Sequence, residues 1–149
     1  MRYFLEIGLF AAVAAGGWML AAPAAEPRGS NRPAATRAFS LCHTGGGRNC
    51  VVDGDTFWMD SIKIRIADID APETHPSRCA EEARLGEAAT LRLRGLLSAG
   101  PVTLVTPPRA TDRYGRALRI ATRGGRSLGE QLVSEGLARR WTGRRQPWC

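Results

Sequence analysis

The segment 50–69 constrains the fold most, because it has the pattern of a β-hairpin. Apolar and polar residues alternate strictly over 62–66, which is the two-residue period of a strand with one buried face. The preceding run, 56–59, is rich in aromatic and β-branched residues. Asp60 and Ser61 stand between the two runs, where a two-residue turn would connect them. We therefore expect an antiparallel sheet, with the isoleucines of 62–66 on one face.

Two helices are expected after the hairpin. Apolar residues form one stripe over 85–99, and Gly100 follows where that helix would end. Ser127 opens a Ser-Leu-Gly-Glu capping box, and Gly136 stands where the second helix would stop. The order of hairpin, helix, two strands and helix predicts a small α+β domain with a barrel-sized sheet. The two later strands are expected at 102–105 and 117–122.

The N-terminal residues 1–25 differ in character from the rest of the chain. The run 7–25 is uncharged and rich in Ala, Gly and Leu. It favours a signal peptide with a small-x-small cleavage pattern at 22–24, and an uncleaved membrane anchor is the alternative. Residues 26–38 carry Pro, Gly, Ser and Arg without apolar periodicity and indicate a linker. One domain, 39–149, follows, and we expect it to be periplasmic, secreted or anchored outside the cytoplasm.

The charge of the chain is strongly basic. It has 21 Lys+Arg against 14 Asp+Glu, a formal net charge of +7, and all the basic residues except Lys63 are arginines. Arginine presents a planar fork of donors that suits phosphate. This excess favours a polyanionic partner such as nucleic acid. A high genomic GC content is the alternative explanation for the arginines.

Four cysteines follow the N-terminal segment. An even number in a small exported domain indicates two disulfides. A zinc site that also uses His43 and His75 is the alternative, but the spacing lacks a Cys-x2-Cys pair. The cysteines are Cys42, Cys50, Cys79 and Cys149.

Three disulfide connectivities are possible, and we expect one of them. Cys42 and Cys50 flank the flexible glycines 45–47, which can bring them within bonding distance. Cys79 and Cys149 are then left to pair. That bond would pin the C-terminal tail beside the segment that follows the hairpin.

Acidic residues bracket the hairpin at both ends. Asp-Gly-Asp at 53–55 enters it, and Asp-Ile-Asp at 68–70 leaves it. The start of one strand lies beside the end of its antiparallel neighbour, so Asp55 and Asp70 should converge. Two carboxylates with backbone carbonyls and water suit Ca²⁺ or Mg²⁺. The alternative is that these residues are ordinary turn acids.

Two arginines are placed to complement such a cation site. Arg65 lies on the polar face of the second hairpin strand, and Arg116 closes the turn-like segment 112–116. A phosphodiester gains charge on its oxygens as it reaches its transition state, and guanidinium groups stabilise that charge. The alternatives are a solvated strand face for Arg65 and a surface turn for Arg116.

These motifs together point to a known family. They are Val-Asp-Gly-Asp-Thr at 52–56, Arg65, Asp-Ala-Pro-Glu-Thr at 70–74 and Asp-Arg-Tyr-Gly-Arg at 112–116. In order and spacing they closely resemble the staphylococcal nuclease (thermonuclease) family, over about residues 50–138. The resemblance implies an OB-fold, a five-stranded Greek-key β-barrel with two or so packed helices. It also implies a calcium-dependent nuclease that hydrolyses phosphodiester bonds of DNA and RNA.

The resemblance also assigns roles around a cation. It implies that Asp55, Asp70 and the backbone carbonyl of Ala71 bind Ca²⁺. Glu73 matches the residue that orients or deprotonates the attacking water. The family more often has Thr at the position of Ala71, but a carbonyl ligand does not depend on the side chain.

The remaining matched residues bind phosphate. Arg65 and Arg116 match the arginines that clamp the scissile phosphate, and Arg113 and Tyr114 match residues that contact a terminal phosphate. The sequence departs from the family in lacking its long C-terminal helix and the tyrosines that stack on the base. Trp141, flanked by arginines, is a candidate platform for a base, and packing on the end of the barrel is the alternative.

Two other functions compete with the nuclease. One is an OB-fold module that binds nucleic acid without cleaving it, and the other is a periplasmic calcium-binding module. The carboxylates argue against the first, because they would repel a bound phosphate. Nothing in the sequence indicates oligomers, so we expect a monomer.

Overall fold

The structure is a computed structural model that describes residues 36–43 and 46–149. The expected signal peptide or anchor at 1–25 and most of the expected linker at 26–38 lie outside the described residues. In the described part, no helix has the length and apolar character needed to cross a membrane.

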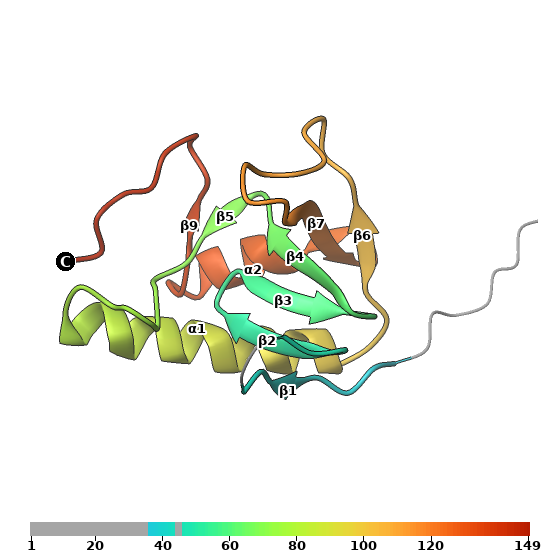
Figure 1. Ribbon diagram of the computed structural model, residues 1–149, viewed down its shortest axis with the longest axis horizontal. Coiled ribbons are helices and arrows are strands. Elements are labelled where there is room, and N and C mark those ends of the chain that lie inside the picture. Colours follow the sequence, from blue (N-terminus) through green and yellow to red (C-terminus); the bar gives the residue numbers. More distant parts are fainter. Residues whose placement is uncertain (1–35, 44–45) are drawn as a thin grey trace, which may run out of the picture. The chain divides into compact units, whose positions relative to one another are not determined.

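The main sheet has the strand order β1-β2-β3-β4-β7-β6, with β8 paired to β7 (Figure 1). β1 is parallel to β2 and β4 is parallel to β7, whereas the other neighbours are antiparallel. β5 and β9 form a separate antiparallel pair. The strands are β1 (Ser40–Leu41), β2 (Cys50–Asp53), β3 (Thr56–Met59), β4 (Ile62–Ile66), β5 (Ile69–Asp70), β6 (Thr103–Val105), β7 (Ala117–Arg123), β8 (Arg126–Ser127) and β9 (Arg139–Arg140).

This arrangement, with two helices, confirms the predicted α+β class. Five strands were expected for the barrel, whereas the described residues form nine shorter strands. β1, β5, β8 and β9 are pairings of only two residues each, which a pattern search over the sequence does not detect.

The hairpin of β3 and β4 forms as predicted. Its turn is Asp60-Ser61, both with positive φ (50° and 67°), and Met59 pairs with Ile62 across it. The predicted division of faces is only partly correct. Ile64 is buried, but Ile62 is 57% exposed at the turn, and Arg65 is buried although it was expected on the polar face. The solvated-face alternative for Arg65 is therefore wrong.

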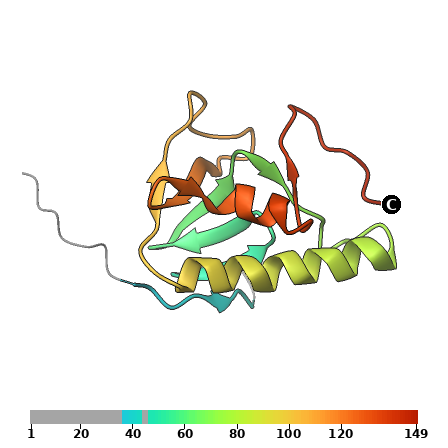
Figure 2. The same ribbon diagram turned by 180° about the vertical axis from the view of Figure 1, so that it is seen from behind.

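Two helices cover the sheet, as Figures 1 and 2 show. α1 (Ala80–Ser98) begins five residues before the predicted start, with Cys79 as its N-cap. α2 (Leu128–Ser134) is capped by Ser127, whose hydroxyl accepts a hydrogen bond from the amide of Glu130 at 3.1 Å, as the capping box predicts. The core lies between helices and sheet, and its largest fully buried side chains include Phe57, Ile64, Ile66, Ile69, Leu93, Leu97 and Leu132.

Both disulfides have the expected pairing. Cys42 is bonded to Cys50, and Cys79 is bonded to Cys149. None of these four residues is a free thiol, so the alternative of a zinc site built on them is wrong. The second bond ties the C-terminus to the N-terminal end of α1 (Figure 1).

Candidate active site

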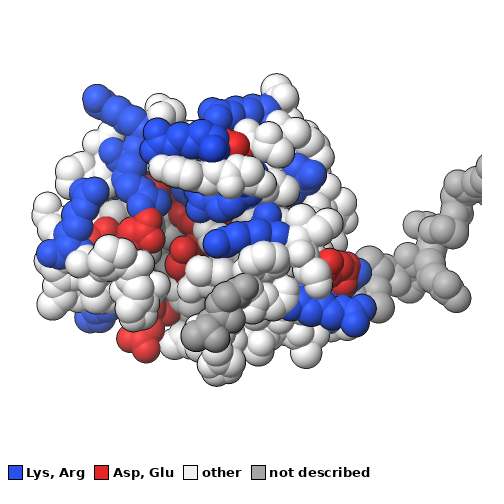
Figure 3. Space-filling view, in the orientation of Figure 1, with Lys and Arg blue, Asp and Glu red and all other residues white. Residues whose placement is uncertain are grey.

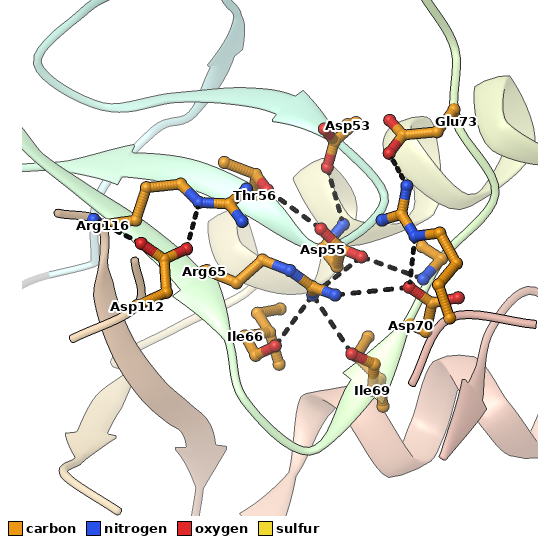
Figure 4. A network of polar contacts seen from close by, with 12 residues as sticks. Asp53, Asp55, Thr56, Arg65, Ile66, Ile69, Asp70, Glu73, Asp112 and Arg116 are labelled. Carbon is orange, nitrogen blue, oxygen red and sulfur yellow. Dashed lines mark hydrogen bonds and ion pairs between the residues drawn. The ribbon is translucent and has the colours of Figure 1, made fainter. Parts of the chain in front are cut away.

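The turn from β2 into β3 brings the first acidic segment against the second. Gly54 makes this possible, because a Cβ at that position would lie 2.6 Å from the Cβ of Ala89 and 2.7 Å from that of Ala71. Distances this short do not occur between real side chains, so the Asp-Gly-Asp motif needs its glycine for close packing. Asp55 follows directly and points toward the start of the 70–74 segment (Figure 4).

Asp55 is buried and fully bonded, with 3% of its surface exposed. Its Oδ1 accepts a hydrogen bond from the hydroxyl of Thr56 at 2.9 Å, and its Oδ2 accepts one from the amide of Ala71 at 2.9 Å. The same Oδ2 lies 2.7 Å from Nη1 of Arg65. The predicted convergence of the two ends of the hairpin is thus present in the structure.

Arg65 lies between the two acidic residues. Its Nη1 contacts Asp55 and donates to the carbonyls of Ile66 (2.9 Å) and Ile69 (3.1 Å), while its Nη2 lies 3.4 Å from Oδ1 of Asp70. A buried guanidinium is stable only when its charge and donors are matched. The structure therefore fixes Arg65 by two carboxylates and two carbonyls (Figure 4).

Asp70 has one oxygen with partners and one without. Its Oδ1 contacts Arg65 and also Nε of Arg145 at 3.1 Å, whereas its Oδ2 is buried and has no hydrogen-bond partner. Burial raises the pKa of Asp70, and the attraction of Arg145 and Arg65 opposes this shift. A buried oxygen with an unused lone pair is what a bound cation would satisfy.

A further acid, Asp53, lies beside these residues, although the sequence reasoning did not assign it a role. Its Oδ1 accepts a hydrogen bond from the amide of Asp55 at 3.1 Å. Burial, together with repulsion by the Asp55 carboxylate, raises the pKa of Asp53 to about 7. The site therefore concentrates more negative charge than its two arginine neighbours fully offset.

Glu73 lies at the open side of the site, with a third of its side chain exposed (33%). Its carboxylate forms an ion pair with Nη1 of Arg145, a residue of the C-terminal tail. Burial alone would lower the pKa of Arg145, but its hydrogen bond to Glu73 and the attraction of Asp70 raise it further above the ordinary value. Sequence reasoning missed Arg145, because no pattern distinguishes it from the neighbouring arginine at 144.

The other predicted phosphate-binding residues lie on the loop between β6 and β7. Nε of Arg116 lies 2.6 Å from Oδ2 of Asp112. The other carboxylate oxygen of Asp112, Oδ1, accepts hydrogen bonds from the backbone amides of Tyr114 and Arg116. Arg113 and Arg116 both lie over the ring of Tyr114, at 4.8 and 5.6 Å from its centre. Figure 4 places Arg116 on the side of the site opposite Glu73. Arg65 and Asp55 are drawn between them in that view.

Trp141 lies beside Arg65. Its ring centre is 6.0 Å from the guanidinium carbon of Arg65, and its amide donates to the carbonyl of Asp68 at 2.9 Å. Of the surface of Trp141, 42% is exposed, so the residue is partly covered and packing on the end of the barrel stays the alternative. Its role as a base platform stays a prediction.

The donor atoms fit a hard cation. Within residues 36–43 and 46–149, no group of three or more His, Cys, Asp or Glu side chains gathers as a metal site. The candidate instead offers two carboxylates, Asp55 and Asp70, with the backbone carbonyl of Ala71 as the predicted third ligand. The unpartnered oxygen of Asp70 supports this fit, and carboxylate and carbonyl oxygens are the ligands that Ca²⁺ prefers.

The surrounding surface is basic. Figure 3 shows, on the face seen in Figure 1, a group of acidic side chains with Lys and Arg side chains above it and on both sides, and with mostly uncharged residues below it. The positive potential of these side chains attracts a polyanion to the surface around the acidic group. The site thus combines the buried carboxylates of Asp55 and Asp70 with the guanidinium groups of Arg65 and Arg145.

Comparison with known proteins identifies the family. The family model described as staphylococcal nuclease homologue matches residues 63–147, more than half of the chain. The chain therefore belongs to the staphylococcal nuclease homologue family, which confirms the resemblance and the OB-fold that it implied.

Three relatives from Bacillus subtilis (strain 168) share the domain. Endonuclease YhcR is 38% identical over 99 residues, SPbeta prophage-derived endonuclease YokF is 36% identical over 96, and endonuclease YncB is 34% identical over 96. Each alignment covers 59% of this chain, but only 8%, 31% and 44% of the respective relative. The chain thus spans less than half the length of each of these proteins.

Proposed function

We propose that this chain is a nuclease that hydrolyses phosphodiester bonds of DNA and RNA with the help of bound Ca²⁺. The observation that carries the proposal is the buried bridge of Arg65 between Asp55 and Asp70, with Glu73 at its open edge. Membership of the family and the three endonuclease relatives support it. A module that only binds nucleic acid has no use for buried carboxylates facing phosphate.

The cation would be held by Asp55, Asp70 and the carbonyl of Ala71, and when bound it would supply positive charge to the phosphate oxygens. Arg65 is prevented from rotating by its bonds to the carbonyls of Ile66 and Ile69. Its guanidinium is thus preorganised, so stabilising a developing charge costs little rearrangement.

Glu73 is the residue best placed to act on water. Its side chain is 33% exposed, whereas the side chains of Asp55 and Asp70 are 5% and 4% exposed. A carboxylate there can accept a proton from a water molecule that attacks phosphorus. Arg116, oriented by Asp112, can donate hydrogen bonds to the phosphate from the other side.

We propose that the protein acts outside the cytoplasm. Both disulfides are of the kind that persists in oxidising compartments, and the uncharged N-terminal run is the expected export signal. The protein should accordingly be recovered with both bonds formed from the periplasm, the medium or the outer face of a membrane.

Incubation of the purified chain with labelled single-stranded DNA, double-stranded DNA and RNA tests the function. Each substrate is offered with Ca²⁺, with Mg²⁺ or with a chelator. The proposal expects shortened products in Ca²⁺ and none in the chelator. Binding of the nucleic acid without any shortening, in every condition, would support the binding module instead.

A further inference from the structure

The C-terminal residues 141–149 form a strap that is fixed at both ends to the segment carrying the candidate site. At one end, β9 pairs with β5, so that Arg139 lies opposite Asp70. At the other end, Cys149 is bonded to Cys79, the N-cap of α1. The strap therefore spans the same stretch of chain, 70–79, that contains Glu73 (Figure 1).

Contacts along the strap hold its course. The amide of Trp141 donates to the carbonyl of Asp68 at 2.9 Å. Nη1 of Arg139 donates to the carbonyl of Pro147 at 2.9 Å, and the same guanidinium lies 3.8 Å from the ring centre of Trp148. The end of the strap is thus held against β9 by Arg139, although most residues of the strap are exposed.

Arg145 reaches the site from the middle of the strap. Its Nε lies 3.1 Å from Oδ1 of Asp70, and its Nη1 pairs with Glu73. The side chain is 36% exposed, so it lies at the mouth of the site and not in the core. In the described part of the chain, the structure gives the preceding Arg144 no ion pair.

The guanidinium of Arg145 and a bound cation would draw on the same negative charge. Asp70 is one of the two candidate carboxylate ligands, and Arg145 already neutralises part of its charge. Two cations cannot both approach one carboxylate closely without repelling each other. Arg145 contacts Oδ1 of Asp70, and the unpartnered Oδ2 is the oxygen open to the cation, so the two positive charges would repel each other across one carboxylate and the contact with Arg145 opposes binding of Ca²⁺.

We propose that Arg145 is a built-in competitor for the cation, held at the acidic site by the strap. The inference rests on the proposed calcium site. In the cation-free protein Arg145 offsets the charge of Asp70 and Glu73, and it therefore opposes binding of Ca²⁺. Because the strap is tied at Cys79, the effective concentration of Arg145 at the site is high, and it falls when the disulfide is reduced.

Calorimetric titration of the full chain with Ca²⁺ tests the proposal without any measurement of activity. Arg145→Gln removes the competing charge, and Arg144→Gln is the matched control with the same loss of charge one residue away. Arg145→Gln is expected to tighten Ca²⁺ binding about tenfold relative to the control, which corresponds to about 1.4 kcal/mol. Thermal unfolding in chelator verifies that each variant is folded.

The outcomes separate this inference from the proposed function. If wild type and both variants bind no Ca²⁺, the proposed calcium site is wrong, and the proposed competition by Arg145 is wrong as well. If wild type binds Ca²⁺ and the two variants bind it equally well, the calcium site stands and the competition is wrong. Weaker binding by Arg145→Gln would show that Arg145 supports the cation instead of opposing it.

The disulfide provides a second arm. The double variant Cys79→Ser, Cys149→Ser releases the strap, and we expect Ca²⁺ binding to tighten as in Arg145→Gln. Combining the two changes should give no further tightening, because both remove the same contact. A strap that merely braced the site would give the opposite sign, a loss of affinity on release. That result would overturn the proposal.

Discussion

Arg65 and Asp55 form a buried ion pair, with Nη1 2.7 Å from Oδ2 and with 9% and 5% of the two side chains exposed. The pair is formed across the hairpin of β3 and β4, which joins the two acidic segments. Pairs of this kind gain little net stability when they form, but they cost much when one partner is removed. Arg65 is therefore structurally required by the acidic site as well as proposed to act on phosphate.

Replacement of Arg65 by Met should destabilise the cation-free protein by about 3 kcal/mol or more, because Asp55 and Asp70 lose their shared partner. Ca²⁺ should reduce this loss, since the cation offsets the same carboxylates. Chemical denaturation in chelator and in Ca²⁺ measures both effects. Arg94→Met, on the exposed face of α1, is the control and should change stability by less than about 0.5 kcal/mol. An Arg65→Met protein as stable as wild type in chelator would show that the pair does not hold the site.

Replacement of Glu73 by Gln should lower kcat by about 10²–10⁴-fold, the usual contribution of a general base. Stability should change little, because the side chain is a third exposed. Steady-state kinetics on a single-stranded oligonucleotide measures the effect, and Glu81→Gln, on α1 with its side chain 62% exposed, is the control. Turnover of Glu73→Gln at the wild-type rate would assign the base to another residue.

Gly54→Ala should destabilise the protein by about 1–3 kcal/mol, because the added methyl group has to displace Ala71 or Ala89. Since Ala71 lies next to Asp70, we also expect weaker Ca²⁺ binding. Gly95→Ala is the matched control. Its Cβ meets nothing within 4 Å, so it should stabilise α1 by about 0.5–1 kcal/mol. Chemical denaturation compares the two, and equal stability of both variants would show that the close approach at Gly54 is not needed.

The hairpin and the start of α2 could be predicted, because each depends on residues that are close together in the sequence. The alternation at 62–66, the turn at Asp60-Ser61 and the capping box at Ser127 all depend on neighbours in sequence, and all appear in the structure. The apolar stripe did not predict the early start of α1, because the first turn of the helix carries Glu81 and Glu82. These residues favour a helix N-terminus through their negative charge and not through apolar periodicity.

The convergence of Asp55 and Asp70 could be predicted from the antiparallel pairing of the hairpin strands. The contacts that Arg65 and Arg145 make with these two residues could not. Arg65 alternates like a surface residue, but it is buried, and its guanidinium donates to the carbonyls of Ile66 at the end of β4 and Ile69 at the start of β5. Arg145 reaches Asp70 only because the β9 pairing and the Cys79–Cys149 bond fold the tail back. The sequence near Arg145 does not indicate this contact, because the tail carries four arginines and no local pattern distinguishes one of them from the others.

The dependence of DNA cleavage on Ca²⁺ concentration in Asp70→Ala tests the central claim most directly. Wild type should cleave a single-stranded oligonucleotide with a saturable dependence on Ca²⁺ and should stop when the ion is chelated. Asp70→Ala should not cleave at any Ca²⁺ concentration, whereas Asp60→Asn, at the exposed hairpin turn where positive φ tolerates Asn, should match wild type. Cleavage by wild type in chelator, or by Asp70→Ala at the wild-type rate, would contradict the assignment of this site.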